Sequence, residues 1–196
     1  KWDWLIKNSQ WLSDISNTPI SNVAINNNEK LILLKSFADA SIYNQLLENL
    51  PKGILENMTI ISPYYNKNGD VITNLLNDLK PETVDVVVVS RFGTVPYKFP
   101  IQKSVQFHEW ENVKNNGNNE SPRLHAKIIQ FKYKNETCIL TGSTNATIEA
   151  LGTKTTTSRN AEMSILIKSN ENKNWLEELE IKIPLKGTFN LSSYNK

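Results

Sequence analysis

His125 and Lys127 are the residues whose types and spacing most clearly allow chemistry. If they lie on a β-strand, alternation places the imidazole and the ammonium on one face and Leu124, Ala126 and Ile128 on the opposite, apolar face. An imidazole is a nucleophile, and a lysine is a compact fixed cation. The pair is therefore suited to attack on a phosphate group.

The segment that follows is expected to return to His125 as the second strand of a hairpin. If Lys134–Asn135 forms a two-residue turn, symmetry about that turn places Lys127 opposite Gly142 and His125 opposite Thr144. The residues after Gly142 then lie at the same end of the sheet as His125.

The short polar stretch that begins at Gly142 has the features of an anion site. Gly142 has no Cβ to block a close ligand, and Ser143 either caps a helix or offers a hydroxyl donor. Asn145 is expected to begin a helix over 146–151 that Gly152 ends. Because a helix N-terminus carries unpaired amides and a partial positive charge, an anion is its expected ligand.

Three motifs in sequence order resemble those of the phospholipase D superfamily: His125-x-Lys127, Gly142-Ser143-x-Asn145 about fifteen residues later, and Asn160-x-Glu162 before a further apolar strand. The resemblance covers residues 124 to about 167, and residues 60–65 resemble the strand and loop that precede the motif in nuclease-like branches. One departure is Lys132, which stands where the family's full motif has an Asp. Several nuclease and restriction-associated branches also lack that Asp, which favours them over true phospholipases.

The resemblance implies a covalent phosphohistidine mechanism. His125 is then the nucleophile, or the acid on the other side of the phosphate, while Lys127 and Asn145 hold a non-bridging oxygen. Glu162 is expected to bond the other imidazole nitrogen and fix the tautomer. No cofactor and no metal site are predicted, since His, Cys and carboxylates show no ligand spacing. The residues expected to contact the substrate are Gly142, Ser143 and Thr144.

A phosphohistidine site needs two histidines on opposite sides of one phosphate, and this chain supplies one motif copy. His108 lacks the neighbouring motif residues, so it is expected to be structural. The complete site is therefore expected to need a second motif copy, from a homodimer partner about a two-fold axis or from another half of a longer polypeptide. The chain begins at Lys1 without an initiator methionine, which keeps the second option open.

The composition is that of a globular protein, with 39% hydrophobic and 21% charged residues among 196. A single domain over residues 1–196 is expected, with an irregular tail at 182–196. The net charge of +2 does not by itself indicate a nucleic-acid partner. The single Cys138 cannot form an intramolecular disulfide, which fits a cytoplasmic location, and no apolar run reaches the ~18 residues of a membrane span.

A strand–helix–strand unit is expected in the first half of the chain. Residues 58–61 and 84–89 have the character of buried strands, and the periodicity of 71–79 predicts a helix between them. This order predicts a parallel pair. The predicted fold class is α/β, with a mixed, largely parallel sheet flanked by helices on both faces. Further predictions include strands at 105–110 and 163–167 and helices at 3–16 and 175–181.

The sequence as a whole favours a metal-independent phosphodiesterase, foremost a nuclease of bacterial defence or repair, with nucleic acid as its partner and no membrane. Two other functions stay open. The missing Asp and the missing second motif are also what a non-catalytic module for dimerisation or nucleic-acid binding would show. A phospholipid head-group hydrolase or transferase would need an amphipathic or apolar lip near the site, and the sequence shows none. Sequence alone does not separate DNA, RNA and lipid as substrates.

Overall fold

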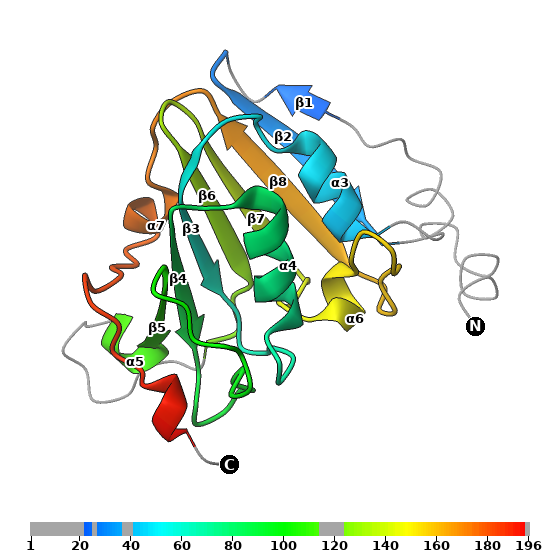
Figure 1. Ribbon diagram of the computed structural model, residues 1–196. Coiled ribbons are helices and arrows are strands. Elements are labelled where there is room, and N and C mark those ends of the chain that lie inside the picture. The colour runs from blue at the N-terminus through cyan, green and yellow to red at the C-terminus, as the bar shows by residue number, and fades with distance from the viewer. Residues whose placement is uncertain (1–21, 25–26, 37–40, 114–123, 195–196) are drawn as a thin grey trace.

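An eight-stranded mixed sheet runs through the centre of the protein (Figure 1). The structure is a computed structural model, and it describes residues 22–24, 27–36, 41–113 and 124–194, so the predicted helix at 3–16 lies outside the described residues. The strand order is β1-β2-β8-β7-β6-β3-β4-β5. The strands are β1 (Asn22–Ala24), β2 (Glu29–Lys35), β3 (Leu55–Ile61), β4 (Thr83–Val88), β5 (Val105–Glu109), β6 (Ile128–Tyr133), β7 (Thr137–Gly142) and β8 (Met163–Ser169).

The mixed α/β sheet is confirmed, but the expected predominance of parallel pairs is wrong. Within the described sheet only β3–β4 and β4–β5 are parallel, and the other five neighbouring pairs are antiparallel. The connections explain the difference. Helix α4 (Asp70–Leu79) carries the chain from β3 back to the start of β4, whereas the three residues between β6 and β7 can only reverse its direction.

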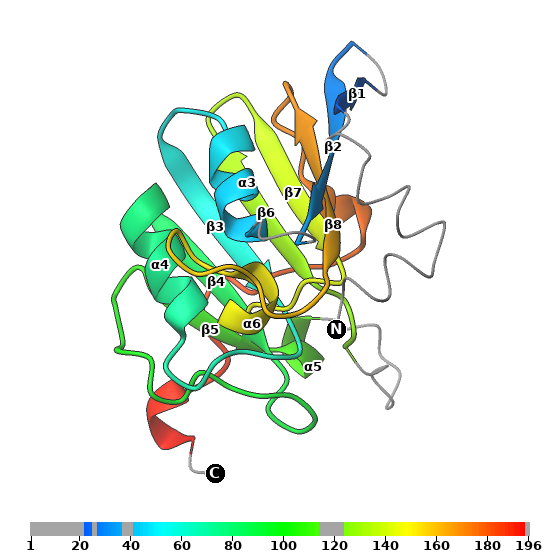
Figure 2. The same ribbon diagram turned by 90° about the vertical axis from the view of Figure 1, so that its right-hand side faces the viewer.

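Helices cover both faces of the sheet, as predicted (Figures 1 and 2). One face carries α3 (Ile42–Asn49), α4 and α6 (Ile148–Leu151). The opposite face carries the short helices α5 (Trp110–Val113) and α7 (Trp175–Glu178), the latter ending earlier than the predicted 175–181. Each face therefore has its own hydrophobic core.

Strand β4 shows how the sequence specifies a strand buried on both sides. Val86 and Val88 belong to the core under α4, and Val87 belongs to the core on the other face. β-Branched residues suit such a doubly covered strand. Asp85 is the polar exception, and its Oδ1 lies 2.9 Å from Nε2 of the fully buried His108 on β5. His108 is thus a residue of the sheet interior.

The strand register defines one end of the sheet, which we call the motif end. The pairs Ile61↔Ile128, Ile128↔Thr141 and Gly142↔Ser164 place the last residues of β3 and β7 beside the first residues of β6 and β8. Because β4 runs parallel to β3, it also finishes there. The loops that follow β3, β4 and β7 therefore gather at the motif end.

The segment 182–194 is irregular, as expected, but it packs against the edge strand β5. The amide of Gly187 donates to Oε1 of Gln106 at 2.7 Å, and the amide of Phe189 donates to the carbonyl oxygen of Phe107 at 3.0 Å. The one-turn 3-10 helix Leu191–Ser193 buries its leucine. The segment therefore shields part of an otherwise open strand edge.

Candidate active site

His125 and Lys127 lie at the motif end, directly before β6. The strand begins later than the sequence predicts, since regular pairing starts with Ile128 opposite Thr141. From there to the turn, the pairs keep the register predicted for a hairpin about Lys134–Asn135. His125 is exposed and Lys127 is partly buried.

The side chains of His125 and Lys127 are in contact. Nζ of Lys127 lies 3.3 Å from Nε2 of His125 and donates to the backbone carbonyl oxygen of His125 at 2.8 Å. A charged lysine has no acceptor, so Nε2 accepts and the proton of the neutral ring is assigned to Nδ1. Leu124 is buried but Ala126 is exposed, so only part of the predicted apolar face forms. An imidazole lone pair therefore lies beside a cation.

Glu162 precedes β8 at the motif end and is held on both sides of its carboxylate. The hydroxyl of Ser143 donates to Oε2, and Nδ2 of Asn160 donates to Oε1 at 3.2 Å. The amide of Glu162 donates to Oγ of Ser36 at 2.7 Å, and only 7% of the residue is exposed. These bonds fix a negative charge close to Lys127.

Glu162 acts on the His–Lys pair through Lys127. Burial removes part of the hydration of the ammonium and lowers the pKa of Lys127 below its ordinary value of 10.5. The Glu162 carboxylate raises that pKa, because a negative charge stabilises the ammonium, but burial is the larger effect. Within this chain the Glu162 carboxylate accepts from Ser143 and Asn160, so its bond to a histidine ring stays a prediction.

Gly142 is required by the close approach of β8. Its φ is 148°, and a Cβ there would lie 2.5 Å from the carbonyl oxygen of Met163 and 2.7 Å from Cα of Ser164. The reason is therefore packing and not room for a ligand. Thr144 is also turned inward, where its hydroxyl shares a 2.6 Å hydrogen bond with that of Ser164. Gly142 and Thr144 shape the turn, whereas Ser143 positions a carboxylate.

Helix α6 does not provide the predicted anion site. It is four residues long and begins at Ile148, and its cap is Thr147, whose hydroxyl accepts from the amide of Ala150. The amide of Ile148 is already bonded to Oδ1 of Asn66 at 2.8 Å. Asn145 therefore lies before the helix, partly buried. Its Oδ1 is buried and has no hydrogen-bond partner among the described residues, and the side chain makes no described bond to the His–Lys pair.

Two supporting residues have no signal in the sequence. Ser36 lies 126 positions from Glu162, and the two meet because β2 pairs with β8. Asn66 links the loop after β3 to α6, since its Oδ1 accepts from Ile148 and its Nδ2 donates to Glu149 at 3.0 Å. Only the tertiary arrangement brings these groups together.

Exposed apolar side chains stand on the loops at the motif end. Tyr64 follows β3, and Phe92 and Tyr97 lie in the loop after β4, each more than 40% exposed. The expectation that no apolar lip lies near the site is therefore wrong. These residues lie in loops, so they have no periodic pattern that sequence analysis could detect.

No group of three or more His, Cys, Asp or Glu side chains gathers as a metal site in the ranges that the structure describes. Over the same ranges, every helix is too short or too polar to cross a lipid bilayer.

The mixed sheet and the motifs gathered at one end of it define a phospholipase D-like protein. A family model described as cardiolipin synthase, PLD-like domain, matches residues 30–181, so this chain belongs to the phospholipase D-like family. None of the curated proteins matches the chain significantly.

Solved structures of similar fold share little sequence with this chain. Nuc, a phospholipase D family member from Salmonella typhimurium, is 16% identical, with a TM-score of 0.45 over 78% of this chain and 90% of Nuc. NucT from Helicobacter pylori is 15% identical, with a TM-score of 0.45 over 78% of this chain and 92% of NucT. Yeast tyrosyl-DNA phosphodiesterase is 17% identical, with a TM-score of 0.41 over 71% of this chain. The match spans 32% of that yeast enzyme's length.

Proposed function

We propose that this protein is a phosphodiesterase that cleaves nucleic acid through a phosphohistidine intermediate on His125. The observation that carries the proposal is the exposed imidazole whose Nε2 lies 3.3 Å from Nζ of Lys127. A neutral imidazole nitrogen beside a cation is what nucleophilic attack on a phosphodiester needs. Membership of the phospholipase D-like family supports the same chemistry.

In the first step, the ammonium of Lys127 exchanges Nε2 of His125 for a non-bridging phosphate oxygen, and Nε2 bonds to phosphorus as the bond to the leaving oxygen breaks. A second histidine, on the opposite side of the phosphate, donates its proton to that oxygen. Water then attacks phosphorus and gives a proton to the second histidine, and the nitrogen–phosphorus bond breaks. The ordinary states of both rings are restored.

The neighbouring residues have separate tasks in these steps. Lys127 holds a non-bridging phosphate oxygen, and Nδ2 of Asn145 donates to the same group. Glu162 is a positioning residue, because its carboxylate raises the pKa of Lys127 against the larger effect of burial. Ser143 in turn fixes the carboxylate of Glu162.

The second histidine is proposed to come from another motif copy. His108 cannot serve, because it is fully buried and bonded to Asp85 inside the sheet. A homodimer would place two copies of His125 on opposite sides of one phosphate, and a second motif-bearing half would do the same.

The charge of the loops at the motif end supports nucleic acid as the substrate. The segments 62–69 and 89–104 contain no Asp or Glu, and all of their cations are exposed. Exposed cations of this kind neutralise backbone phosphates. The apolar lip supports a second candidate, a phospholipid head-group enzyme. The cations at the motif end are Lys67, Arg91 and Lys98, whereas Lys103 lies beside the start of β5 at the other end of the sheet.

Cleavage assays in chelator test the proposal. The whole chain is incubated in EDTA with labelled single- and double-stranded DNA, with RNA and with phospholipid vesicles. We expect cleavage of nucleic acid that His125→Ala abolishes and that Lys127→Gln lowers by roughly 100-fold or more. Lys132→Gln is the matched control, because Lys132 is also partly buried but lies toward the other end of β6.

A mixing experiment tests the composite site. If two chains build one site, excess His125→Ala protein lowers activity with the square of the wild-type fraction, whereas a site complete in one chain gives a linear fall. Nucleic-acid binding without cleavage, unchanged in His125→Ala, would indicate a non-catalytic module. Hydrolysis of phospholipid alone would overturn the proposal in favour of the second candidate.

A further inference from the structure

Two loops at the motif end are joined into one surface. The amide of Lys98 donates to the carbonyl oxygen of Lys67 at 2.8 Å, and the amide of Thr94 donates to the carbonyl oxygen of Pro63 at 3.0 Å. The hydroxyl of Thr94 accepts from the amide of Tyr65 at 2.8 Å. The loops after β3 and β4 therefore form a single wall beside the candidate active site.

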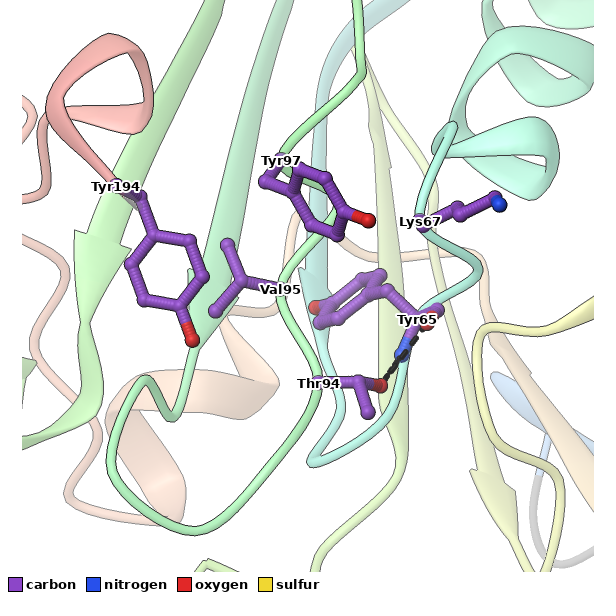
Figure 3. Close-up of a pocket in the computed structure, with 6 residues that line it drawn as sticks. All are labelled: Tyr65, Lys67, Thr94, Val95, Tyr97 and Tyr194. Atoms are coloured by element: carbon purple, nitrogen blue, oxygen red, sulfur yellow. Dashed lines mark hydrogen bonds between the residues drawn. The ribbon is translucent and has the colours of Figure 1, made fainter. Parts of the chain in front are cut away.

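This wall contains a cavity of about 260 Å³ whose lining is mostly apolar. It is smaller than the roughly 300–1,000 Å³ of pockets for drug-sized ligands, so it suits one ring system. Figure 3 shows Tyr97 and Tyr194 on either side of Val95, with Tyr65 and Lys67 on the loop that follows β3. The lining residues are Tyr65, Lys67, Thr94, Val95, Tyr97 and Tyr194.

The tyrosines offer aromatic surfaces that are already positioned. The hydroxyl of Tyr65 donates to the carbonyl oxygen of Val87 at 2.8 Å, which fixes its ring in the interior. The hydroxyl of Tyr194 donates to the carbonyl oxygen of Ser90 at 3.5 Å. Tyr97 is 42% exposed and lies at the surface of the same cavity. Rings held in this way present faces on which a planar aromatic ligand can stack.

The cavity also lies within reach of the candidate active site. Tyr65 forms a β-bridge with Ala146, the residue directly after Asn145. The two loops that line most of the cavity follow β3 and β4, which lie one and two positions from β6 in a sheet with ~4.8 Å between neighbouring strands. A short extended piece of nucleic acid covers such a distance.

We propose that the cavity between Tyr65, Tyr97 and Tyr194 holds one unpaired base of a single-stranded nucleic acid whose neighbouring phosphate lies at His125. This inference rests on the proposed function and adds a substrate class to it. Stacking requires a base that is out of a duplex, because paired bases are stacked on one another. Lys67, whose side chain is exposed at the rim, holds an adjacent phosphate.

A lipid surface fits the same wall less well. The cavity is concave, and Lys67 and Thr94 add polar groups to its apolar lining. A membrane-inserted lip presents a convex apolar edge, and the tyrosine hydroxyls would lose hydration there. A lipid role is therefore kept as an outcome of the test.

Binding of a labelled single-stranded DNA is measured by fluorescence anisotropy in EDTA, in a His125→Ala background that prevents cleavage. We expect Tyr97→Ala to raise Kd roughly 5- to 100-fold and Tyr97→Phe, which keeps the ring, to leave it unchanged. An abasic strand of equal length should bind with the same Kd to the Tyr97→Ala variant and to its parent, the His125→Ala protein. Lys67→Gln should reduce the slope of log K against log salt by about 0.7. Thermal unfolding of each variant checks its fold.

The outcomes separate this inference from the proposed function. Cleavage by the wild-type protein together with equal Kd values in Tyr97→Ala and its parent would overturn the base-binding cavity alone. Absence of both cleavage and DNA binding would overturn the proposed function and this inference with it. Binding of anionic phospholipid vesicles that Tyr97→Ala abolishes, without DNA binding, would assign the wall to lipid and contradict the proposal.

Discussion

Replacement of Glu162 by glutamine tests how a buried carboxylate controls Lys127. The change removes the charge and keeps the length of the side chain. Because the carboxylate opposes the effect of burial, Glu162→Gln is expected to lower the pKa of Lys127 further. The lysine then loses its proton at a lower pH, and cleavage that depends on the ammonium declines earlier as the solution becomes alkaline.

The same variant should be less stable by an amount that the contacts of Glu162 allow us to estimate. Each carboxylate oxygen accepts one hydrogen bond in a residue that is 7% exposed. An amide nitrogen cannot accept, so the loss of one charge-assisted bond costs about 1.5–3 kcal/mol of unfolding free energy. For a protein of this size, Tm falls by roughly 3–12 °C.

The pH dependence of the lysine's contribution to stability has a definite sign. Between the lowered pKa of folded Lys127 and the ordinary value of 10.5, the unfolded chain carries a proton that the folded chain has lost. The unfolded state therefore binds more protons, and this contribution to stability rises with pH in that interval. In Glu162→Gln the interval starts at a lower pH.

Carbon-13 NMR of protein labelled at lysine Cε measures the pKa directly, with the Lys127 signal assigned from its absence in Lys127→Gln. Glu149→Gln is the matched control, because Glu149 is also partly buried and accepts a 3.0 Å bond from Asn66 but makes no contribution to the pKa of Lys127. A Lys127 pKa that stays constant or rises in Glu162→Gln would refute the reasoning.

Two further substitutions test the packing that holds the site. Gly142→Ala places a Cβ 2.5 Å from the Met163 carbonyl oxygen at a φ of 148°. Urea unfolding should therefore show a loss of about 1–3 kcal/mol or more of unfolding free energy. Gly53→Ala is the control and should be close to neutral, because the nearest atom to its Cβ would be 3.9 Å away. Asp85→Ala leaves the buried ring of His108 without its described partner and should cost about 1–3 kcal/mol of unfolding free energy by the same assay. Asp85→Asn keeps an acceptor and should lose less. Equal losses in the two Asp85 variants would contradict this account.

The hairpin register was accessible to sequence reasoning because it is local. A three-residue connection between β6 and β7 leaves few ways to pair the strands, and symmetry about Lys134–Asn135 selects the observed one. The same reasoning placed Gly142 and Ser143 at the end of the sheet that His125 occupies. Local sequence could not show that pairing stops at Ile128, because that depends on neighbouring strands.

The contact of Glu162 with Ser36 could not be predicted, since the two residues lie 126 positions apart. Ser36 reaches its amide only through the pairing of β2 with β8, and the family resemblance suggested the His125 ring as the partner of the carboxylate. The predominance of parallel strands was overestimated for a related reason. The βαβ unit is visible in a single stretch of chain, whereas the antiparallel pairing of β2 with β8 joins distant segments.

The lining of the aromatic cavity shows a third kind of limit. Tyr65, Tyr97 and Tyr194 are spread over 130 positions, and none lies in a periodic pattern. They meet because parallel strands β3 and β4 finish at the same edge and the C-terminal segment returns to β5. Such a cluster becomes visible only when the strand order is known.

The division of the sheet into an antiparallel part and a parallel part has a consequence for how this protein can change. The groups proposed for bond breaking lie directly beside the ends of β6, β7 and β8, whose register is tightly constrained, while most groups proposed for recognition lie on the connections that follow β3 and β4. Lengthening or exchanging those connections would alter ligand preference while the reactive centre keeps its geometry, so one scaffold can be diversified for new targets without rebuilding its chemistry.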